Sequence, residues 1–491
     1  MSILKREFSK LIDVCLEKEV DKVNSDKYRL KYHLMPPIGW LNDPNGLCQF
    51  KGEYHVFYQY SPFDANGGLK FWGHYKSKDM IEWEDLGACL YPDTPHDCHG
   101  VYSGSAFVEN DRVYFYYTGN VKHVGSYDYI NNGRGHNTIM VTSEDGINFN
   151  DKKVLLENID YPSNMTCHVR DPKVFKKNDK YFMVLGARDN NHKGCILLYN
   201  SDDLEKWNFL NTISTNEKFG YMWECPDLFE LKDECSGETK SILCISPQGI
   251  EADGYKFNNI YQSGYFLGNM NLENGNFDFG EFIELDRGFD FYAPQTFIDE
   301  KGRTILTGWM GLPDIDEEHY TNPTTKNGWL HALTIPRELV LINNKVYQRP
   351  IEELRKLRGI YISRELKSTR EYNELKGEVY ELDIEFNNDI DNLKINLKSD
   401  CNISFDKNER TIKLSLGDSG YGRKTRSVTI DRLNRLQIFS DTSSLEIFVN
   451  NGEEVFTTRV YSNSNNDKIN ISGNLEDVKI NMYELGEYKY V

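Results

Sequence analysis

The stretch NDPNGLCQFKGEYHVFYQY, residues 42–60, has a form that the chain repeats four more times. A polar start is followed by a short apolar strand, a turn with Gly, Asn or Asp, and a strongly apolar strand. Such runs of apolar and aromatic residues between turns are typical of antiparallel strands. The other copies begin at Tyr102 (YSGSAFVENDRVYFYYTG), Arg170 (RDPKVFKKNDKYFMVLGA), Glu224 (ECPDLFELKDECSGETKSILCIS) and Ala293 (APQTFIDEKGRTILTGWM).

The copies start 60, 68, 54 and 69 residues apart, and a second motif falls between them at a constant phase. This motif is Ser-x-Asp-x-x-x-aromatic and begins at Ser77, Ser143 and Ser201. Each unit has room for about four strands. A β-sandwich has turns every 8 to 12 residues, roughly, but no such superperiod, whereas repeated sheets that bury one another are arranged radially. We therefore predict an all-β fold that begins with a five-bladed β-propeller over residues 31–349.

Different patterns flank the repeats. Apolar residues within 3–23 are spaced close to 3.6 apart, which predicts a short N-terminal helix inside 1–30 that leans on the body of the protein. Residues 350–366 are charged and partly helical, and we interpret them as a linker. From 367 to 491 the alternation is strict and predicts a C-terminal β-sandwich. Its clearest alternating runs lie at 380–386, 393–397, 412–416, 445–449 and 478–482.

Composition excludes several classes of protein. The 57 Lys and Arg against 76 Asp and Glu give a net charge of −19 over 491 residues, which disfavours nucleic acid as a partner. The first thirty residues lack a signal peptide, and no apolar run approaches the roughly 18 residues of a membrane span. The ten cysteines contain no CxxC and fit reduced thiols, so we expect a cytoplasmic protein.

The polar repeat starts are the candidate site. If they converge, Asp43, Asp171 and Glu224 meet Arg170. Neighbouring carboxylates raise one another's pKa, so one can remain a protonated acid while another acts as an anionic nucleophile, as glycoside cleavage requires. Taken singly, each motif also fits a plain turn or a polar strand end. Their recurrence at one phase favours the shared site.

Other chemistry finds no support. The eleven histidines contain no HExxH motif and show no regular ligand spacing, so we predict no metal site. No Gly-rich phosphate loop opens a helix, and no cofactor is implied. We interpret the run GRGH at Gly133 as an exposed loop. Cys225, beside Glu224, either tunes that acid or is simply a small buried residue.

The chain resembles glycoside hydrolase family 32 from about Tyr32 to its C-terminus. The late run SLEIFVNNGEEVFTTRVY from Ser444 is similar to the family's sandwich domain. Seven motifs in the family's order carry the resemblance in the first domain: HLMPPIGWLNDPNG from His33, FYQYSPF from Phe57, FWGHYKSKDMIEW from Phe71, YSGSA from Tyr102, RDPKVF from Arg170, WECPDLF from Trp223 and YAPQTF from Tyr292.

The resemblance implies a retaining hydrolase of β-fructofuranosidic bonds. It implies that Asp43 is the nucleophile, Glu224 the general acid and base, and Asp171 a stabiliser of the transition state through sugar hydroxyls. A retaining pair of carboxylates lies about 5 to 5.5 Å apart. Matching family positions that bind the fructosyl unit are Asn42, Gln59, Trp72, Ser103 and Arg170, with Tyr102 and Trp309 as aromatic walls.

The expected substrate is a small sugar, either sucrose 6-phosphate or sucrose. The phosphorylated sugar fits a cytoplasmic enzyme, because sugars imported by phosphorylating transport arrive with a phosphate. Two alternatives stay open: an exo-acting hydrolase of short fructans, and a carbohydrate-binding propeller without catalysis. The second has no need of Asp43 and Glu224 together. The sequence leaves the oligomeric state and the residues of a phosphate site open.

Overall fold

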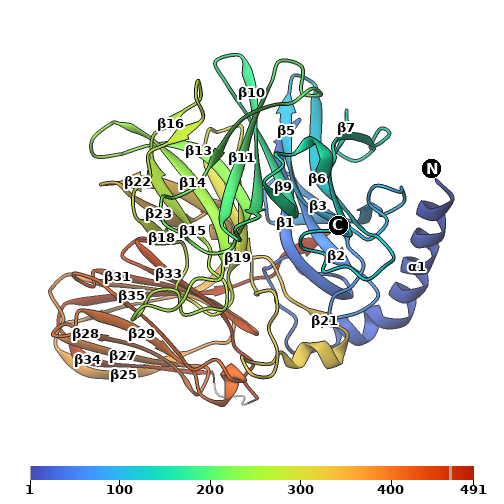
Figure 1. Ribbon diagram of the computed structural model, residues 1–491. Helices are drawn as coiled ribbons and strands as arrows, with labels where there is room; N and C mark the ends of the chain where they lie inside the picture. The colour runs from blue at the N-terminus through green and yellow to red at the C-terminus, as the bar shows by residue number, and fades with distance from the viewer. Residues whose placement is uncertain (1, 464–466) are drawn as a thin grey trace.

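A computed structural model describes residues 2–463 and 467–491. Strands dominate it and fall into two groups, a set of sheets from residue 39 to residue 350 and a pair of large sheets from residue 358 to residue 485. Figure 1 shows the first group above the second, with α1 along one side of the first. The all-β prediction is confirmed at this level.

The N-terminal helix α1 spans Ile3–Asn24, as the apolar spacing predicts. The side chain of Ser2 caps it by accepting a 3.0 Å hydrogen bond from the backbone N–H of Lys5. Ile12 and Val23 are buried against the body of the protein. The helix therefore packs on the first group of sheets through one face.

Five sheets follow one another along the first group, each starting at one sequence repeat. Their strands are, in spatial order, β21 (Trp329–Leu330), β1 (Gly39–Phe50), β2 (Glu53–Ser61), β3 (Phe71–Ser77), β4 (Glu82–Leu90) and β36 (Lys489–Tyr490); β5 (Val101–Glu109), β6 (Arg112–Lys122), β7 (Arg134–Ser143) and β8 (Lys153–Leu156); β12 (Asn208–Ile213), β11 (Gly194–Ser201), β10 (Lys180–Asp189) and β9 (Met165–Lys177); β13 (Met222–Lys232), β14 (Thr239–Gln248), β15 (Gly264–Gly268) and β18 (Phe282–Glu284); β19 (Tyr292–Ile298), β20 (Thr304–Trp309), β22 (Arg337–Ile342) and β23 (Lys345–Pro350).

The first strands of the five sheets contact one another in a closed ring. β1 contacts β5, β5 contacts β9, β9 contacts β13, β13 contacts β19, and β19 contacts β1 again. The polar repeat starts lie on these five strands, so the ring brings them together. Short elements complete this region: β16 (Met270–Asn271), β17 (Asn276–Phe277), η1 (Asn158–Asp160) and η2 (Pro323–Asn327).

The Ser-x-Asp motif forms the turn before the last strand of three sheets. In the first of them, Ser77 Oγ accepts the N–H of Met80, and Asp79 Oδ1 accepts the N–H of Ile81 at 3.0 Å. Asp145 and Asp203 make the equivalent bonds. Short polar side chains stabilise turns in this way, which is why the motif recurs.

One prediction about a loop is wrong. The run GRGH was expected to be exposed, but β7 begins at Arg134 and His136 is completely buried. The ladder between β6 and β7 extends over ten residue pairs and ends at the pair Lys122 and Arg134, so the sheet takes up this segment. Short polar runs give no sign of such pairing.

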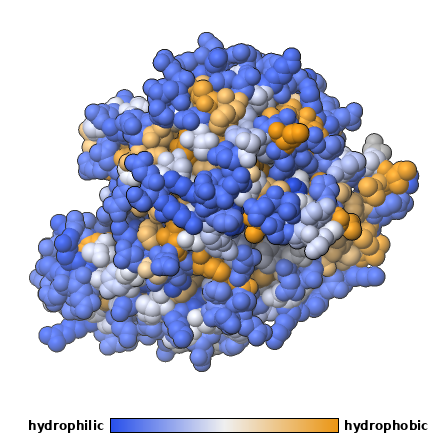
Figure 2. Space-filling model, viewed as in Figure 1, coloured by the Kyte–Doolittle hydropathy of each residue, from blue (hydrophilic) through white to orange (hydrophobic). Residues whose placement is uncertain are grey.

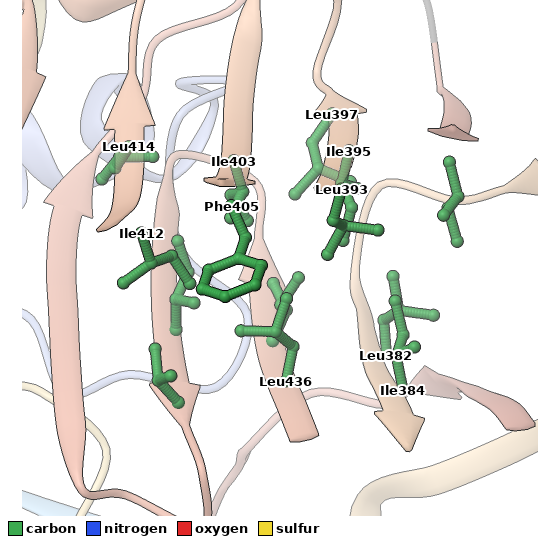
Figure 3. Close-up of a cluster of buried hydrophobic side chains, with 14 of the residues drawn as sticks. Leu382, Ile384, Leu393, Ile395, Leu397, Ile403, Phe405, Ile412, Leu414 and Leu436 are labelled. Atoms are coloured by element: carbon green, nitrogen blue, oxygen red, sulfur yellow. The ribbon is translucent and has the colours of Figure 1, made fainter. Parts of the chain in front are cut away.

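Two six-stranded sheets form the second group, with an apolar core between them (Figure 3). The alternating runs predicted from the sequence supply this core, including Leu382, Ile395 and Leu414. One sheet consists of β24 (Arg358–Leu366), β35 (Val478–Leu485), β26 (Tyr380–Phe386), β31 (Arg435–Asp441), β32 (Ser444–Val449) and β33 (Glu454–Arg459), and the other of β25 (Thr369–Lys376), β34 (Lys468–Leu475), β27 (Asn392–Leu397), β28 (Cys401–Asp406), β29 (Thr411–Ser415) and β30 (Thr425–Thr429). A short helix, η4 (Asp418–Gly420), precedes β30.

The segment 350–366 contains regular structure. The short helix η3 (Glu352–Leu357) is followed directly by β24, which pairs with β35 at the edge of a sandwich sheet. Every residue of β24 is exposed or half-buried, so its charged sequence lacks the alternation of a core strand.

The two groups of sheets also meet through buried charge. Arg337 on β22 is completely buried, and it pairs with Asp286 at 3.1 Å and with Glu446 of β32 at 2.5 Å. The C-terminal strand β36 returns to pair with β4 of the first sheet.

The surface in the view of Figure 1 is mostly hydrophilic, with separate apolar areas, one of them over α1 (Figure 2). Ile3, Leu4 and Leu11 are exposed on that helix. Within residues 2–463 and 467–491, no helix combines the length and the apolar character that crossing a membrane requires.

Candidate active site

Each first strand of the five sheets carries a β-bulge where its repeat begins. A bulge places an extra residue in one strand and turns side chains out of the regular ladder, which is common next to active sites. The shifts in register fall between Leu41 and Pro44 in β1, Val101 and Gly104 in β5, Arg170 and Lys173 in β9, Glu224 and Asp227 in β13, and Tyr292 and Gln295 in β19.

Two successive residues mark each bulge, and we call them the first and second bulge positions. In β9, β13 and β19 the first position is the last paired residue before the bulge. Four of the five second positions precede a proline, and three of these residues have a positive φ: 62° at Asp171, 47° at Cys225 and 46° at Ala293. Such a conformation is uncommon for residues other than glycine and concentrates at functional sites. The first positions are Asn42, Tyr102, Arg170, Glu224 and Tyr292, and the second are Asp43, Ser103, Asp171, Cys225 and Ala293.

Asp43 is held by a chain of amide and hydroxyl groups. Ser103 donates a hydrogen bond to Oδ2 of Asp43, and Asn42 donates to Oδ1 at 3.1 Å. Gln59 joins these two donors, because it accepts a 2.7 Å bond from Asn42 and donates one of 2.7 Å to Ser103. The indole N–H of Trp40 donates a 2.9 Å hydrogen bond to Oδ1 of Asn42. The carboxylate of Asp43 is thus fixed in one orientation.

Cys225 lies between two of the carboxylates. Its Sγ is 3.7 Å from Oδ2 of Asp43 and 3.7 Å from Oδ2 of Asp171. The backbone N–H of Cys225 donates a 2.9 Å hydrogen bond to the same oxygen of Asp171. The thiol thus contacts the two aspartates.

Glu224 receives hydrogen bonds at both carboxylate oxygens. Arg170 donates to Oε1 through Nη2 and, at 3.1 Å, through Nε. Tyr292 and Gln248 donate to Oε2 at 2.7 and 2.8 Å. The side chain of Glu224 keeps 14% of its surface exposed, against 4% for Asp171, so Glu224 lies nearer the solvent.

Burial and mutual repulsion make the two aspartates weak acids. Burial raises the pKa of Asp43, although the bonds from Ser103 and Asn42 oppose the rise. Burial likewise raises the pKa of Asp171 to about 7; Arg170 opposes this, while Glu224 and Asp43 add to it. Groups with perturbed pKa values that gather at one point are typical of catalytic sites.

Aromatic side chains line part of the site. The rings of Trp40 and Trp309 are 5.8 Å apart, and the ring of Tyr292 is 6.2 Å from Trp309. Trp72 is completely buried and donates a 3.1 Å hydrogen bond to the backbone oxygen of Tyr102. The structure therefore brings Trp309 beside the first bulge positions and places Trp72 behind Tyr102.

Five residues of this site were not predicted from the sequence: Trp40, Tyr292, Lys70, Gln248 and His168. Tyr292 begins the run YAPQTF and directly precedes the fifth repeat copy, so starting that copy at Ala293 hid its equivalence to Glu224. Lys70 lies over the Trp40 ring at 5.0 Å, and burial lowers its pKa to about 7 while Asp43 opposes the drop. Gln248 ends β14, and His168 Nδ1 is 2.6 Å from Arg170 Nη1. No motif marks these three. In the part of the chain that the structure describes, no three His, Cys, Asp or Glu side chains are grouped to hold a metal ion.

Comparison with known proteins identifies the family. Residues 33–350 match the N-terminal domain of glycosyl hydrolases family 32, and residues 351–484 match its C-terminal domain. The chain therefore belongs to glycoside hydrolase family 32, as the motifs indicate. Members of this family combine a β-propeller with a β-sandwich.

Relatives match over almost the whole chain. Sucrose-6-phosphate hydrolase of Bacillus subtilis is 40% identical over 467 residues, which are 93% of this chain and 94% of that protein. The enzyme of the same name from Staphylococcus xylosus is 41% identical over 92% and 90%. The structure of sucrose-6-phosphate hydrolase from Lactobacillus gasseri superimposes with a TM-score of 0.85 at 29% identity, covering 97% of each chain. A β-fructofuranosidase of Bombyx mori gives 0.84 at 31%, over 99% and 100%.

Proposed function

We propose that this chain cleaves the β-fructofuranosidic bond of sucrose 6-phosphate, and of sucrose less efficiently, with retention of configuration. Asp43 is the nucleophile, Glu224 the general acid and base, and Asp171 the stabiliser of the fructosyl unit. The observation that carries the proposal is the meeting of these three carboxylates on β1, β9 and β13, with Cys225 in contact with two of them and Arg170 bound to the third.

In the first step Asp43 attacks the anomeric carbon of the fructosyl unit. Its orientation is fixed by Ser103 and Asn42, so its carboxylate needs little reorganisation as the ester bond forms. Glu224 gives a proton to the bridging oxygen, and the glucosyl part leaves. We expect the two carboxyl groups to lie about 5 to 5.5 Å apart, as in retaining enzymes.

In the second step Glu224 takes a proton from water, which attacks the fructosyl ester and frees Asp43. Arg170 and Tyr292 hold the carboxylate of Glu224 in place for both transfers. Asp171 and the amide and hydroxyl groups of Asn42, Gln59 and Ser103 supply hydrogen-bond partners for the sugar hydroxyls, with Trp309 and Tyr102 as aromatic walls.

We further infer that the five sheets are the blades of a five-bladed propeller. The closed ring of first strands and the four strands per repeat support this count. In this division residues 1–30 form the helix, 31–349 the catalytic domain, 350–366 the connection and 367–491 the sandwich.

The substrate follows from the relatives and from chemistry. The two bacterial relatives above are sucrose-6-phosphate hydrolases. A phosphorylated sugar is available inside the cell that imported it, so we assign the reaction to the cytoplasm. Hydrolysis of short fructans by the same carboxylates is the alternative.

A single comparison tests the proposal. The purified protein is assayed with sucrose 6-phosphate, sucrose and a short fructan, and kcat/KM is measured for each. We expect the highest value for sucrose 6-phosphate, with the released fructofuranose first appearing as the β anomer by NMR. A higher value for the fructan contradicts the substrate, and release of the α anomer contradicts the retaining mechanism.

A further inference from the structure

Three cations near the site have no carboxylate partner. Lys122 ends β6, Arg134 begins β7 and Arg188 lies near the end of β10; we call them the cation cluster. In residues 2–463 and 467–491, none of the three forms an ion pair. Arg188 donates a 3.0 Å hydrogen bond to Nδ1 of His192, which is not a carboxylate. The chain has 76 acidic and 57 basic residues, so three cations without a carboxylate partner at one place are unexpected.

Strand pairing and one loop hold the cluster together. Arg134 is the cross-strand partner of Lys122 in the ladder between β6 and β7. The ammonium group of Lys122 lies 5.6 Å from the centre of the Tyr129 ring, and the backbone oxygen of Tyr129 is 3.1 Å from Nε2 of His168. Arg188 follows Ala187, which pairs with Val169 beside His168. Arg134 and Arg188 are therefore near enough to His168 to lower its pKa, and Lys122 is linked to it through Tyr129.

His168 connects the cluster to the general acid. Its Nδ1 lies 2.6 Å from Nη1 of Arg170, and Arg170 donates to Oε1 of Glu224. Glu224 protonates the oxygen of the leaving group, so the leaving group binds beside it. The cation cluster thus lies on the side of Glu224 that Arg170 contacts, close to where the leaving group binds.

Polar atoms in this region are buried without a partner. Among the residues that the structure describes, Nε of Arg134 has no hydrogen-bond partner, and neither has either ring nitrogen of His136, a completely buried residue. The His136 ring is 5.6 Å from that of His168 and 5.9 Å from that of Tyr102, the expected wall of the site. Burial and the adjacent cations lower the pKa of both histidines, so both are neutral and carry one N–H each. His168 donates its N–H to the backbone oxygen of Tyr129 and accepts from Arg170, which leaves His136 as the histidine with an N–H to offer. Unsatisfied buried donors are costly unless a ligand completes them.

The opposite side of Glu224 is acidic. There Tyr292 occupies Oε2, and its ring is 6.2 Å from that of Tyr261. The hydroxyl of Tyr261 donates a 2.9 Å bond to Oδ2 of Asp314. A dianion at the leaving group would meet the carboxylate of Asp314 on this side, and Lys122 and Arg134 on the other. Arg188 reaches from that other side toward Tyr261, because its guanidinium lies 4.9 Å from the centre of the Tyr221 ring and Tyr221 donates a 3.4 Å hydrogen bond to Tyr261.

We propose that Arg134, with Arg188 and Lys122, binds the phosphate of a hexosyl phosphate leaving group and so sets the preference for the phosphorylated substrate. This inference rests on the proposed function. Guanidinium groups suit phosphate because they offer parallel N–H donors, and a phosphomonoester carries close to two negative charges at pH 7. The neutral His136 adds a donor without adding charge.

The test compares two substrates on one variant. For Arg134→Gln we expect kcat/KM for sucrose 6-phosphate to fall about 10- to 100-fold, and to fall far less for sucrose. Inhibition by glucose 6-phosphate should weaken by a similar factor, while inhibition by glucose changes little. In the unaltered protein the ratio of the two kcat/KM values should drop as salt rises through about 0.1 M, because screening weakens exposed charge pairs.

The control is Arg112→Gln. Arg112 begins β6, the strand that Lys122 ends, about 33 Å away at 3.3 Å per residue, and it pairs with Glu144 at the surface. The Arg112→Gln variant removes one positive charge from the same sheet, and kcat/KM for both substrates should be unchanged. If Arg134→Gln is too unstable to assay, Arg188→Gln is measured in its place, with the same expected direction.

The outcomes separate this inference from the proposed function. An unaltered protein with no preference for sucrose 6-phosphate overturns the substrate and this inference with it. A preference for sucrose 6-phosphate that persists in both Arg134→Gln and Arg188→Gln overturns the phosphate-binding role of the cation cluster and leaves the proposed substrate standing. Equal losses on sucrose and its phosphate also overturn it, since they indicate a general structural role.

Discussion

The hydroxyl group of Tyr292 donates a 2.7 Å hydrogen bond to Oε2 of Glu224, and the two residues occupy equivalent positions in neighbouring repeats. Arg170 holds the other carboxylate oxygen from the repeat on the opposite side. Glu224, the proposed general acid, is therefore oriented by its own counterparts in the sheets on either side. Only the closed ring of first strands brings these three side chains together.

Replacing the acid should affect substrates unequally. For Glu224→Gln we expect hydrolysis of sucrose to fall about 100- to 10,000-fold, the usual contribution of a general acid. A β-fructofuranoside with an activated aryl leaving group needs no proton for its departure, so formation of the fructosyl ester from it should be largely retained. The burst of aryl alcohol in stopped-flow measures this step. Equal losses on both substrates would exclude the acid role.

Replacing the nucleophile should remove activity without unfolding the protein. In Asp43→Asn the amide keeps the volume and can still accept the bond from Ser103, but it cannot form the ester. We expect a loss of at least about 1,000-fold for both sucrose and the aryl fructoside. Mass spectrometry excludes deamidation, and Asp111→Asn, in the exposed turn after β5, is the matched control. Residual activity of a few per cent would falsify the assignment.

The spacing of the repeats predicted most of this site, because residues at the same point of each repeat lie at the same point of the ring. It could not separate the two bulge positions: Asp43 and Asp171 occupy the second, whereas Glu224 occupies the first. That distinction depends on the local geometry of the bulges. The residues that precede the prolines do not indicate this geometry. Lys70 and Gln248 reach the site from other strands and loops through tertiary packing, so the motifs gave no sign of them.

The protonation of Asp171 should make stability depend on pH. Its pKa is raised to about 7 in the folded protein, against about 3.9 when unfolded, so the folded state binds the proton more tightly. The associated stability is fully present below about pH 4 and is lost as the pH rises through 7. Asp171→Asn should therefore melt at a higher temperature than the unaltered protein at pH 8, and the difference should shrink toward pH 4. Calorimetry at both pH values measures it; a constant difference would contradict the shifted pKa.

The buried charges between the domains should be sensitive to the loss of one member. Arg337 donates to Asp286, Gln348, Glu446 and Thr457. Arg337→Met therefore leaves Asp286 buried without its cation, and Glu446 with His33 as its remaining ionisable partner. We expect a loss of about 3 to 5 kcal/mol in the free energy of unfolding, measured with urea. Arg112→Met, which breaks an exposed pair with Glu144, should cost no more than about 1 kcal/mol. Similar losses in the two variants would count against the network.

Cys225 should resist alkylation in the folded protein. Its thiol is buried, and burial followed by the charges of Asp171, Asp43 and Glu224 raises its pKa well above the ordinary value. Alkylation needs the thiolate, which is scarce at such a site. After brief treatment with iodoacetamide at pH 8, peptide mass spectrometry should find the exposed Cys235 modified and Cys225 intact, with activity retained. In denaturant both should react. Modification of Cys225 in the folded protein, with loss of activity, would instead reveal a reactive thiolate between the two aspartates and contradict the charge arrangement that the structure places there.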